Sequence, residues 1–384
     1  TVAANGVLKG VAPDATLVAY KVLNSGGGGS TANILKALEK MLDPNGDGDY
    51  SDHYDIASMS LGGFGNPDDP LSLAVDRLVS HGIVVVVAAG NTGKTFSIGS
   101  PGTARRAITV GSSKKDDTLS SFSSRGPVVW EGGVISKPDI LAPGSSIRST
   151  VPKGTCDACS SSRYRTLSGT SMAAPHVSGA AALLLQRSPT MTPEDVKEAL
   201  MHGTVDIGFK SFEQGAGRIS VIQSLDKDVR LGDDNRFSVS FGLGQRRVTK
   251  DIAVTSDRSS PTGVVIRSSL SPVDGADIPG LLTLSSNTFC LSPSETRTIQ
   301  GVFDVGQQRL STYVGYLDLD IFKDCSFATP EKTVRVPVVA APVNKLVVHI
   351  NVTTTSNTIS WGDIFVRGVD GTIVRTNVGW FGET

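Results

Sequence analysis

The chain has 384 residues, and its 36 basic and 37 acidic residues give a net charge of −1. This balance gives no reason to expect nucleic acid or an anionic membrane surface as a partner. The length allows two or three domains, and the hydrophobic content is ordinary for a soluble globular protein. No apolar run is long enough to predict a membrane span.

Residues 1–227 alternate between strand-like and helix-like segments. The run at 83–89 is apolar throughout, as expected of a strand that is covered on both faces. The expected strands are 16–23, 56–61, 83–89, 107–111 and 139–143, and the expected helices are 30–41, 71–81, 171–186 and one that begins near 192. The pattern predicts an α/β domain, a parallel sheet with helices on both faces.

The pattern changes after residue 227, where helical spacing disappears. Short alternating runs separated by Gly, Pro, Ser and Asp predict an all-β sandwich over 228–343. Residues 344–384 continue as strand-like stretches. They predict a β-rich extension or the start of a further β-module.

The segment with the strongest chemical signal is 168–179, which reads SGTSMAAPHVSG. It places Ser171 at the start of an alanine-rich helix, where free backbone N–H groups and the positive end of the helix dipole favour negative charge. The segment resembles the nucleophile segment of the subtilases, the subtilisin-like serine proteases. The resemblance implies that Ser171 is the nucleophile, and that Asn91, in the run 87–91, donates its side-chain amide to the oxyanion.

A serine nucleophile needs a base, normally a histidine oriented by a carboxylate. The first six residues, TVAANG, resemble those that follow the catalytic histidine segment of subtilases. His176 lies only five positions after Ser171 and is interpreted as structural. The resemblance therefore implies that the base and its aspartate come from a preceding segment or a second polypeptide.

The substrate is expected to be a polypeptide held as an added β-strand between two backbone edges. The resemblance places one edge at 60–62 and the other in the glycine run 26–29, and it places a wide first specificity pocket nearby. The implied binding residues are Ser60, Leu61 and Gly62 on one side, Gly27 and Gly28 on the other, and Ala89 and Gly99 in the pocket. Small pocket residues predict a preference for sizeable apolar side chains. The 233–343 part resembles, more weakly, the fibronectin-III-like domain of some larger subtilases.

The loop 43–52 alternates acidic or amide side chains with other residues. Oxygen ligands in a glycine-rich loop suit Ca²⁺, and the proposed ligands are Asp43, Asn45, Asp47, Asp49 and Asp52. The bidentate glutamate of a helix-loop-helix calcium site is absent, because residue 12 of the loop is Tyr54. The expected role of calcium is structural, and the alternative is an acidic, solvated turn.

The four cysteines form two pairs by position. Cys156 with Cys159, and Cys290 with Cys325, are interpreted as two disulfides of a secreted or cell-envelope protein, with a redox pair at Cys156 and Cys159 as the alternative. A glycosylation sequon begins at Asn351. The function predicted from the sequence is a secreted serine endopeptidase. Two alternatives stay open, an inactive subtilase fragment and an adhesion or assembly role for the β-rich half.

Overall fold

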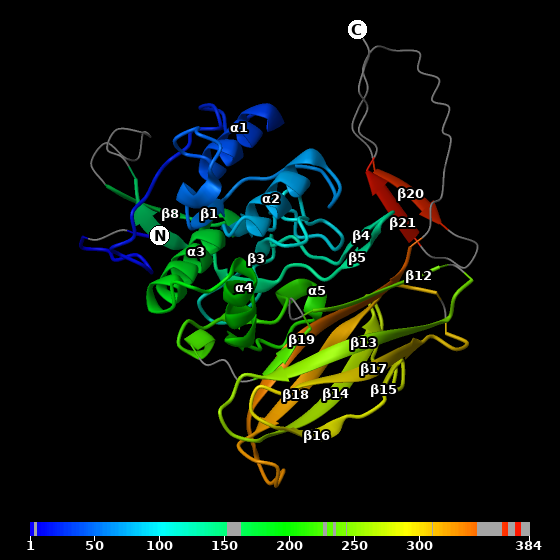
Figure 1. The fold of residues 1–384 in the computed structure, drawn as a ribbon. Helices are drawn as coiled ribbons and strands as arrows, with labels where there is room; N and C mark the ends of the chain where they lie inside the picture. Colours follow the sequence, from blue (N-terminus) through cyan, green and yellow to red (C-terminus); the bar gives the residue numbers. More distant parts are fainter. Residues whose placement is uncertain are drawn as a thin grey trace, which may run out of the picture.

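A computed structural model describes residues 1–3, 6–151, 163–225, 229–232, 236–242, 244–308 and 310–343, and the backbone of 363–367 and 373–377. The helices and a mostly parallel sheet form one half of the molecule, and stacked β-sheets form the other (Figure 1). The predicted fold class, an α/β domain with a parallel sheet followed by a β-rich region, is confirmed. Cys156, Cys159 and Asn351 lie outside the described residues.

The central sheet of the α/β half has six strands in the order β1-β2-β3-β6-β10-β9. The first five run parallel, and β9 pairs antiparallel with β10. Their bounds are β1 Ile56–Met59, β2 Val84–Ala88, β3 Ile108–Ser113, β6 Ile140–Pro143, β9 Thr204–Val205 and β10 Arg218–Ile219. Every residue of β2 is buried, as its unbroken apolar sequence predicts.

Helices cover both faces of this sheet. Alternate residues of β2 separate the two layers, because successive side chains of a strand point to opposite faces. Val84 and Val86 pack with α3 and α4, whereas Val85 and Val87 pack with α1 and α2. The helices are α1 Thr31–Leu42, α2 Pro70–Ser80, α3 Thr170–Arg187, α4 Pro193–His202 and the short α5 Ser211–Gln214.

The helices begin where the capping chemistry of the sequence predicts. Asp69 accepts hydrogen bonds from the first backbone N–H groups of α2, and Pro70 occupies its first turn. Thr192 and Asp195 form a reciprocal capping box on α4. These local signals place the helices close to their expected bounds.

Two small hairpins lie outside the central sheet, β4 Val128–Trp130 with β5 Gly133–Ile135 and β7 Ile147–Thr150 with β8 Tyr164–Leu167. These strands have three or four residues each and were not predicted from the sequence. One expected strand is absent. Residues 15–22 form no strand in the structure, and Leu17 and Val18 are 66% and 53% exposed.

The β-sandwich consists of a four-stranded sheet, β11-β13-β17-β15, and a five-stranded sheet, β12-β19-β18-β14-β16. The strands are β11 Val229–Leu231, β12 Phe237–Phe241, β13 Arg247–Ser256, β14 Thr262–Pro272, β15 Leu282–Leu284, β16 Thr288–Leu291, β17 Thr296–Asp304, β18 Tyr313–Phe322 and β19 Pro330–Pro342. One hydrophobic core lies between the two sheets. A disulfide joins Cys290 to Cys325, and a separate hairpin forms from β20 Asp363–Arg367 and β21 Ile373–Asn377.

The sandwich packs directly on the α/β half near α5, β4 and β5 (Figure 1). The Tyr316 hydroxyl of β18 donates to the carbonyl of Gly215 at 3.1 Å and accepts from the Gln214 amide at 2.9 Å. Lys210 donates to the carbonyls of Val273 and Gly275 at 3.1 and 2.9 Å. Buried hydrogen bonds therefore fix the two halves against each other.

Candidate active site

The site is built around the first turn of α3. Ser171 is the second residue of this helix, so its backbone N–H is one of those with no intrahelical acceptor. The turn is tied to the central sheet through Gly169, whose N–H donates to the Gly144 carbonyl at 2.9 Å, just beyond β6. The nucleophile predicted from sequence therefore lies at the carboxyl end of the parallel sheet, held by backbone hydrogen bonds.

Asn91 lies beside this turn, although it is 80 residues away in sequence. Its Oδ1 accepts from the Thr170 backbone N–H at 2.8 Å and from the Thr170 hydroxyl at 3.1 Å. The Thr170 hydroxyl also contacts the Gly90 backbone. With Oδ1 held in this way, the Asn91 Nδ2 group keeps its donors available, and no acceptor for it lies within the described part of the chain.

The segment after β1 completes the contact around Ser171. The Ser171 hydroxyl donates to the Ser60 carbonyl at 3.3 Å, and the Ser60 hydroxyl donates to the Ser171 carbonyl at 2.8 Å. Ser60 thus brings one of the two expected substrate edges to the nucleophile. The Ser60 carbonyl therefore fixes the direction of the Ser171 hydroxyl.

The pocket residues expected from the sequence gather on the same side. Gly63 and Ser100 form an antiparallel bridge, with hydrogen bonds of 2.8 and 2.9 Å. Gly99 donates to the Ala89 carbonyl at 3.2 Å, and a Cβ on Gly99 would lie 2.8 Å from the Gly63 carbonyl oxygen. This close approach explains the glycine at 99. The structure therefore brings together the segments that contain Leu61 and Gly62, Ala89 and Gly99.

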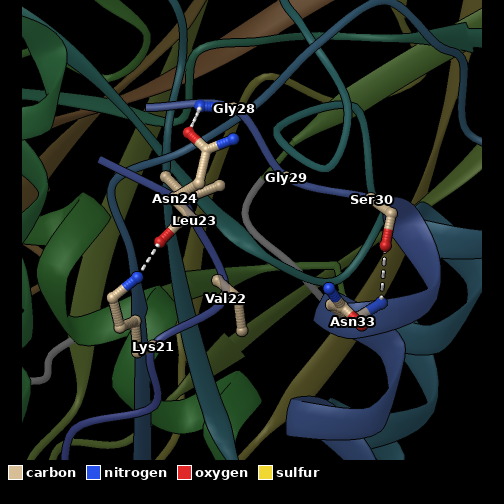
Figure 2. A pocket seen from close by; sticks show the side chains of 8 residues that line it. All are labelled: Lys21, Val22, Leu23, Asn24, Gly28, Gly29, Ser30 and Asn33. Atoms are coloured by element: carbon tan, nitrogen blue, oxygen red, sulfur yellow. Dashed lines mark hydrogen bonds between the residues drawn. The ribbon is translucent and has the colours of Figure 1, made fainter. Parts of the chain in front are cut away.

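The glycine run forms a separate pocket of about 480 Å³, shown in Figure 2. The Asn24 side-chain oxygen accepts from the N–H groups of Gly26 and Gly28 at 2.9 and 3.0 Å, and it closes the loop on itself. Gly27 has φ +79°, a conformation that favours glycine. Gly28 lines the pocket, but Gly27 does not. Within the described residues, no hydrogen bond joins this loop to Ser60 or Ser171.

The four histidines with described positions all have other contacts. The His176 Nδ1 lies 2.9 Å from the Met172 carbonyl on the same helix, and burial lowers the pKa of His176. His53 and His81 also contact backbone carbonyls, and His202 lies near Glu198. No hydrogen bond within the described residues joins a histidine to Ser171, which agrees with the structural interpretation of His176.

The acidic loop 43–52 folds on its own backbone. Asp43 accepts from the N–H groups of Gly46, Asp47 and Gly48 at 2.6 to 3.2 Å. Asn45, Asp47 and Asp49 each accept from the N–H two residues later, and Asp52 ends the short helix 50–52. Within the described ranges, no group of three or more His, Cys, Asp or Glu residues is placed to hold a metal ion.

A buried charge cluster that was not predicted from the sequence surrounds Asp139, the residue before β6. Asp139 is fully buried and lies 2.6 Å from Lys137, 3.3 Å from Lys197 and 3.3 Å from Arg236. Burial acts to raise the pKa of Asp139, but these three cations hold it below its ordinary value. Burial lowers the pKa of Lys137. The sequence predicts only a strand at 139–143 here, because two of the partners of Asp139, Lys197 and Arg236, are distant in sequence.

A serine at a helix N-terminus, with a side-chain amide beside it and a parallel sheet that holds both, is an arrangement typical of serine hydrolases. Residues 1–244 match the family model of the subtilases, so the chain belongs to the subtilase family. It is 44% identical over 219 residues to serine protease AprX of Bacillus subtilis, an alignment that covers 52% of this chain and 49% of that protein.

Two further relatives extend the comparison. Subtilisin E of Bacillus subtilis is 41% identical over 219 residues, covering 56% of this chain and 50% of the relative. Minor extracellular protease Vpr of the same species is 27% identical over 404 residues, covering 68% of this chain and 48% of the relative. This alignment is long enough to include part of the sandwich. The chain spans about half the length of these three relatives.

Proposed function

We propose that this chain carries the nucleophile half of a serine endopeptidase. The observation that supports the proposal is the fixed group of Ser171, Thr170 and Asn91 at the N-terminus of α3. A base removes the Ser171 proton as Oγ attacks a peptide carbonyl. The Ser171 N–H and the Asn91 Nδ2 then donate to the oxyanion. The acyl-enzyme formed after the amine leaves is hydrolysed by water.

The base and its aspartate are proposed to come from a second polypeptide or a preceding segment. The edge of the sheet supports this, because β1 pairs only with β2 within the described residues. An unpaired strand edge is a template for another strand. Leu17 and Val18, in the segment 15–22 that forms no strand, also have exposed apolar side chains. An added strand beside β1 would end near Ser60, which contacts Ser171.

A fluorophosphonate probe followed by intact masses under denaturing conditions tests the proposal. We expect one probe adduct on Ser171, together with a second polypeptide in the same native sample. An unlabelled chain, even when the upstream polypeptide is supplied, would show that the fold no longer carries hydrolytic activity. The adhesion or assembly alternatives would then be preferred.

Replacement of Asn91 by Asp is expected to lower kcat by about 10² to 10³-fold with little change in KM, a range known for removal of one oxyanion donor from a subtilisin. The substitution keeps the oxygen that accepts from Thr170 but replaces the Nδ2 donor. Asn66→Asp is the matched control, because its Oδ1 also accepts a backbone N–H, at 2.7 Å from Asp68. Equal activity in both variants would remove Asn91 from the mechanism.

We propose that peptide substrates bind between the 60–62 segment and the glycine loop 26–29, with their first side chain near Ala89 and Gly99. The backbone bridge at Gly63 and the open pocket beside Gly28 support this arrangement. Ala89 and Gly99, the residues expected to line the first specificity pocket, are small and uncharged. The preference proposed at the cleavage position is therefore a sizeable apolar side chain.

We propose that the loop 43–52 binds Ca²⁺ in a stabilising role. The side-chain oxygens of Asp43, Asn45, Asp47 and Asp49 match the chemistry of the ion, and Gly46 and Gly48 adopt positive φ angles of 82° and 84° that let the loop curl. Calcium would supply positive charge to these clustered oxygens. It has no step in serine acylation.

Addition of Ca²⁺ is expected to raise Tm by a few degrees, about 3 °C or more, whereas Mg²⁺ at the same ionic strength is expected to have less effect. Asp47→Asn should abolish the Ca²⁺ response, because it removes a ligand charge while keeping an oxygen near the Asp49 N–H. Asp116→Asn, on a different exposed turn, is the control. Differential scanning calorimetry is the measurement, and an unchanged response in Asp47→Asn would contradict the calcium assignment.

We propose an extracellular or cell-envelope location. The Cys290–Cys325 disulfide suits an oxidising compartment, and one relative is named an extracellular protease. Among the described helices, none has the length and apolar character needed to cross a bilayer. The sandwich over 229–343 is proposed to be fibronectin-III-like, which its two stacked sheets and single core support.

A further inference from the structure

A cavity of about 240 Å³ lies where the α/β half meets the sandwich, away from the residues of the active site. Its α/β wall consists of Arg105, Trp130 of β4 and two residues of β5, Val134 and Ile135. Its sandwich wall contains Ser238 of β12 and Lys250 of β13, with Arg236 immediately before β12. The cavity is therefore shared by the two halves of the molecule.

All the charged residues that line this cavity are cations. Arg105 lies over the Trp130 ring at 5.0 Å and donates to the Pro67 carbonyl at 2.6 Å. Outside the lining, Asp68 contacts its other Nη and Asp76 lies 3.8 Å from the guanidinium. Arg236 is buried and faces Asp139, which lies behind the cavity rather than in its lining. No carboxylate is part of the lining.

Lys250 is the cation least occupied by the protein. Its ammonium donates to the Ser238 carbonyl at 3.0 Å and lies 5.3 Å from the centre of the Phe237 ring. An ammonium has three protons to donate. Within the part of the chain that the structure describes, these two contacts of the ammonium involve a carbonyl and a ring, and neither involves a carboxylate. Donors therefore remain for a ligand in the cavity.

The size and the walls of the cavity define the ligand class. The volume corresponds to roughly eight water molecules, enough for a phosphate or a short dicarboxylate. The apolar surfaces of Trp130, Val134 and Ile135 reduce the screening of charge, which strengthens attraction between the cations and an anion. Arginine and lysine both form charge-assisted hydrogen bonds to such oxyanions.

We propose that this cavity binds a small oxyanion, a phosphate or a carboxylate, that bridges Arg105 on the α/β half and Lys250 on the sandwich. Because the ligand contacts both halves, its binding stabilises their packing through mass action on the folded state. The proposal concerns the joint between the halves and does not depend on the peptidase mechanism.

The test is the thermal unfolding of the protein in inorganic phosphate, in succinate and in sodium chloride at equal ionic strength and pH. We expect phosphate, succinate or both to raise Tm by about 3 to 5 °C above chloride at saturation. A response to phosphate alone would identify a tetrahedral oxyanion as the ligand. A response to succinate alone, or to both, would extend the class to carboxylates, such as a side chain or terminus of a partner peptide.

Lys250→Met locates the effect, because Lys250 is exposed and the substitution keeps chain length while removing the charge. We expect this variant to fold normally but to lose most of the anion response. The matched control is Lys323→Met, an exposed lysine in the turn after β18, which should respond like the unmodified protein. Isothermal titration calorimetry with the same anions gives an independent readout. No anion effect beyond chloride, or an equal effect in Lys250→Met, would overturn the proposal.

Discussion

Replacement of Ser171 by Ala is expected to abolish both fluorophosphonate labelling and peptide hydrolysis in the complete enzyme, with a loss of about 10⁶-fold in kcat. In the proposed mechanism this hydroxyl is the attacking group. The other hydroxyl in the first turn of α3, that of Thr170, is buried and bonded to Gly90 and Asn91, so it is not expected to replace Ser171. The change removes one hydrogen bond, to the Ser60 carbonyl, from a half-exposed position. The fold should therefore be retained, and the measurements are single-turnover labelling and steady-state hydrolysis of a peptide substrate.

Ser188→Ala is the matched control for this result. Ser188 follows the last turn of the same helix, so the variant makes the same chemical change at the opposite end of α3. Its labelling and hydrolysis should equal those of the unmodified enzyme. Labelling of Ser171→Ala at the unmodified rate would mean that another serine is the nucleophile, and the proposed mechanism would then fail.

The position of Ser171 at a helix start, beside Asn91, was predictable because its signals are local. In the segment 168–179, the small residues of the turn, the serine and the start of the alanine-rich helix occupy consecutive positions. The apolar run at β2 likewise specifies a strand that is buried on both faces, and Asn91 follows directly from it. Local sequence was sufficient to place both residues, and the fold supplied the contact between Thr170 and Asn91.

The remaining features depend on partners that are distant in sequence. The run 16–23 has strand-like residues, but a strand needs a neighbour to pair with, and none lies beside 15–22 within the described residues. The loop 43–52 has the composition of a calcium site, yet its oxygens bond to its own N–H groups. The composition of the loop predicts oxygen ligands, but it does not determine the direction of each side-chain oxygen.

The charge cluster at Asp139 also could not be predicted, because two of its members are distant in sequence. Lys137 is two residues away, but Lys197 comes from α4 and Arg236 from the start of the sandwich. No pattern in the sequence indicates that these four groups meet. Through Arg236, the start of the sandwich contacts a buried group of the α/β half.

Replacement of Asp139 by Asn is expected to cost about 3 to 5 kcal/mol of folding free energy, because three buried cations would lose the carboxylate that they share. Asp139 also accepts from the Thr109 N–H at 2.7 Å, and the remaining oxygen of Asn can keep this hydrogen bond, so the expected loss comes from the charge. The measurement is the urea or thermal unfolding midpoint. A Tm decrease of about 10 °C corresponds to this loss in a domain of this size.

Asp117→Asn is the matched control. Asp117 also pairs with an arginine, Arg218, at 2.5 Å, but its side chain is 44% exposed. Pairs of this kind contribute at most about 1 kcal/mol. Asn also tolerates the positive φ of 60° at this position. If the two variants unfold at the same midpoint, the buried cluster is not the stabilising feature that its geometry indicates.

The pH dependence gives the cluster a second signature. The pKa of Asp139 is lowered in the folded state from an ordinary value of 3.8, so its contribution is complete above that value and is lost as pH falls below it. The unmodified protein should therefore lose stability steeply below about pH 4, whereas Asp139→Asn should lose less over the same range because it has no carboxyl group to protonate at this position.

A Lys137→Met change in the Asn variant should recover part of the loss, since burial already lowers the pKa of Lys137 and an apolar side chain removes the buried charge altogether. Loss of the recovery would show that Lys137 contributes through its hydrogen bond to the Ala107 carbonyl rather than through its charge.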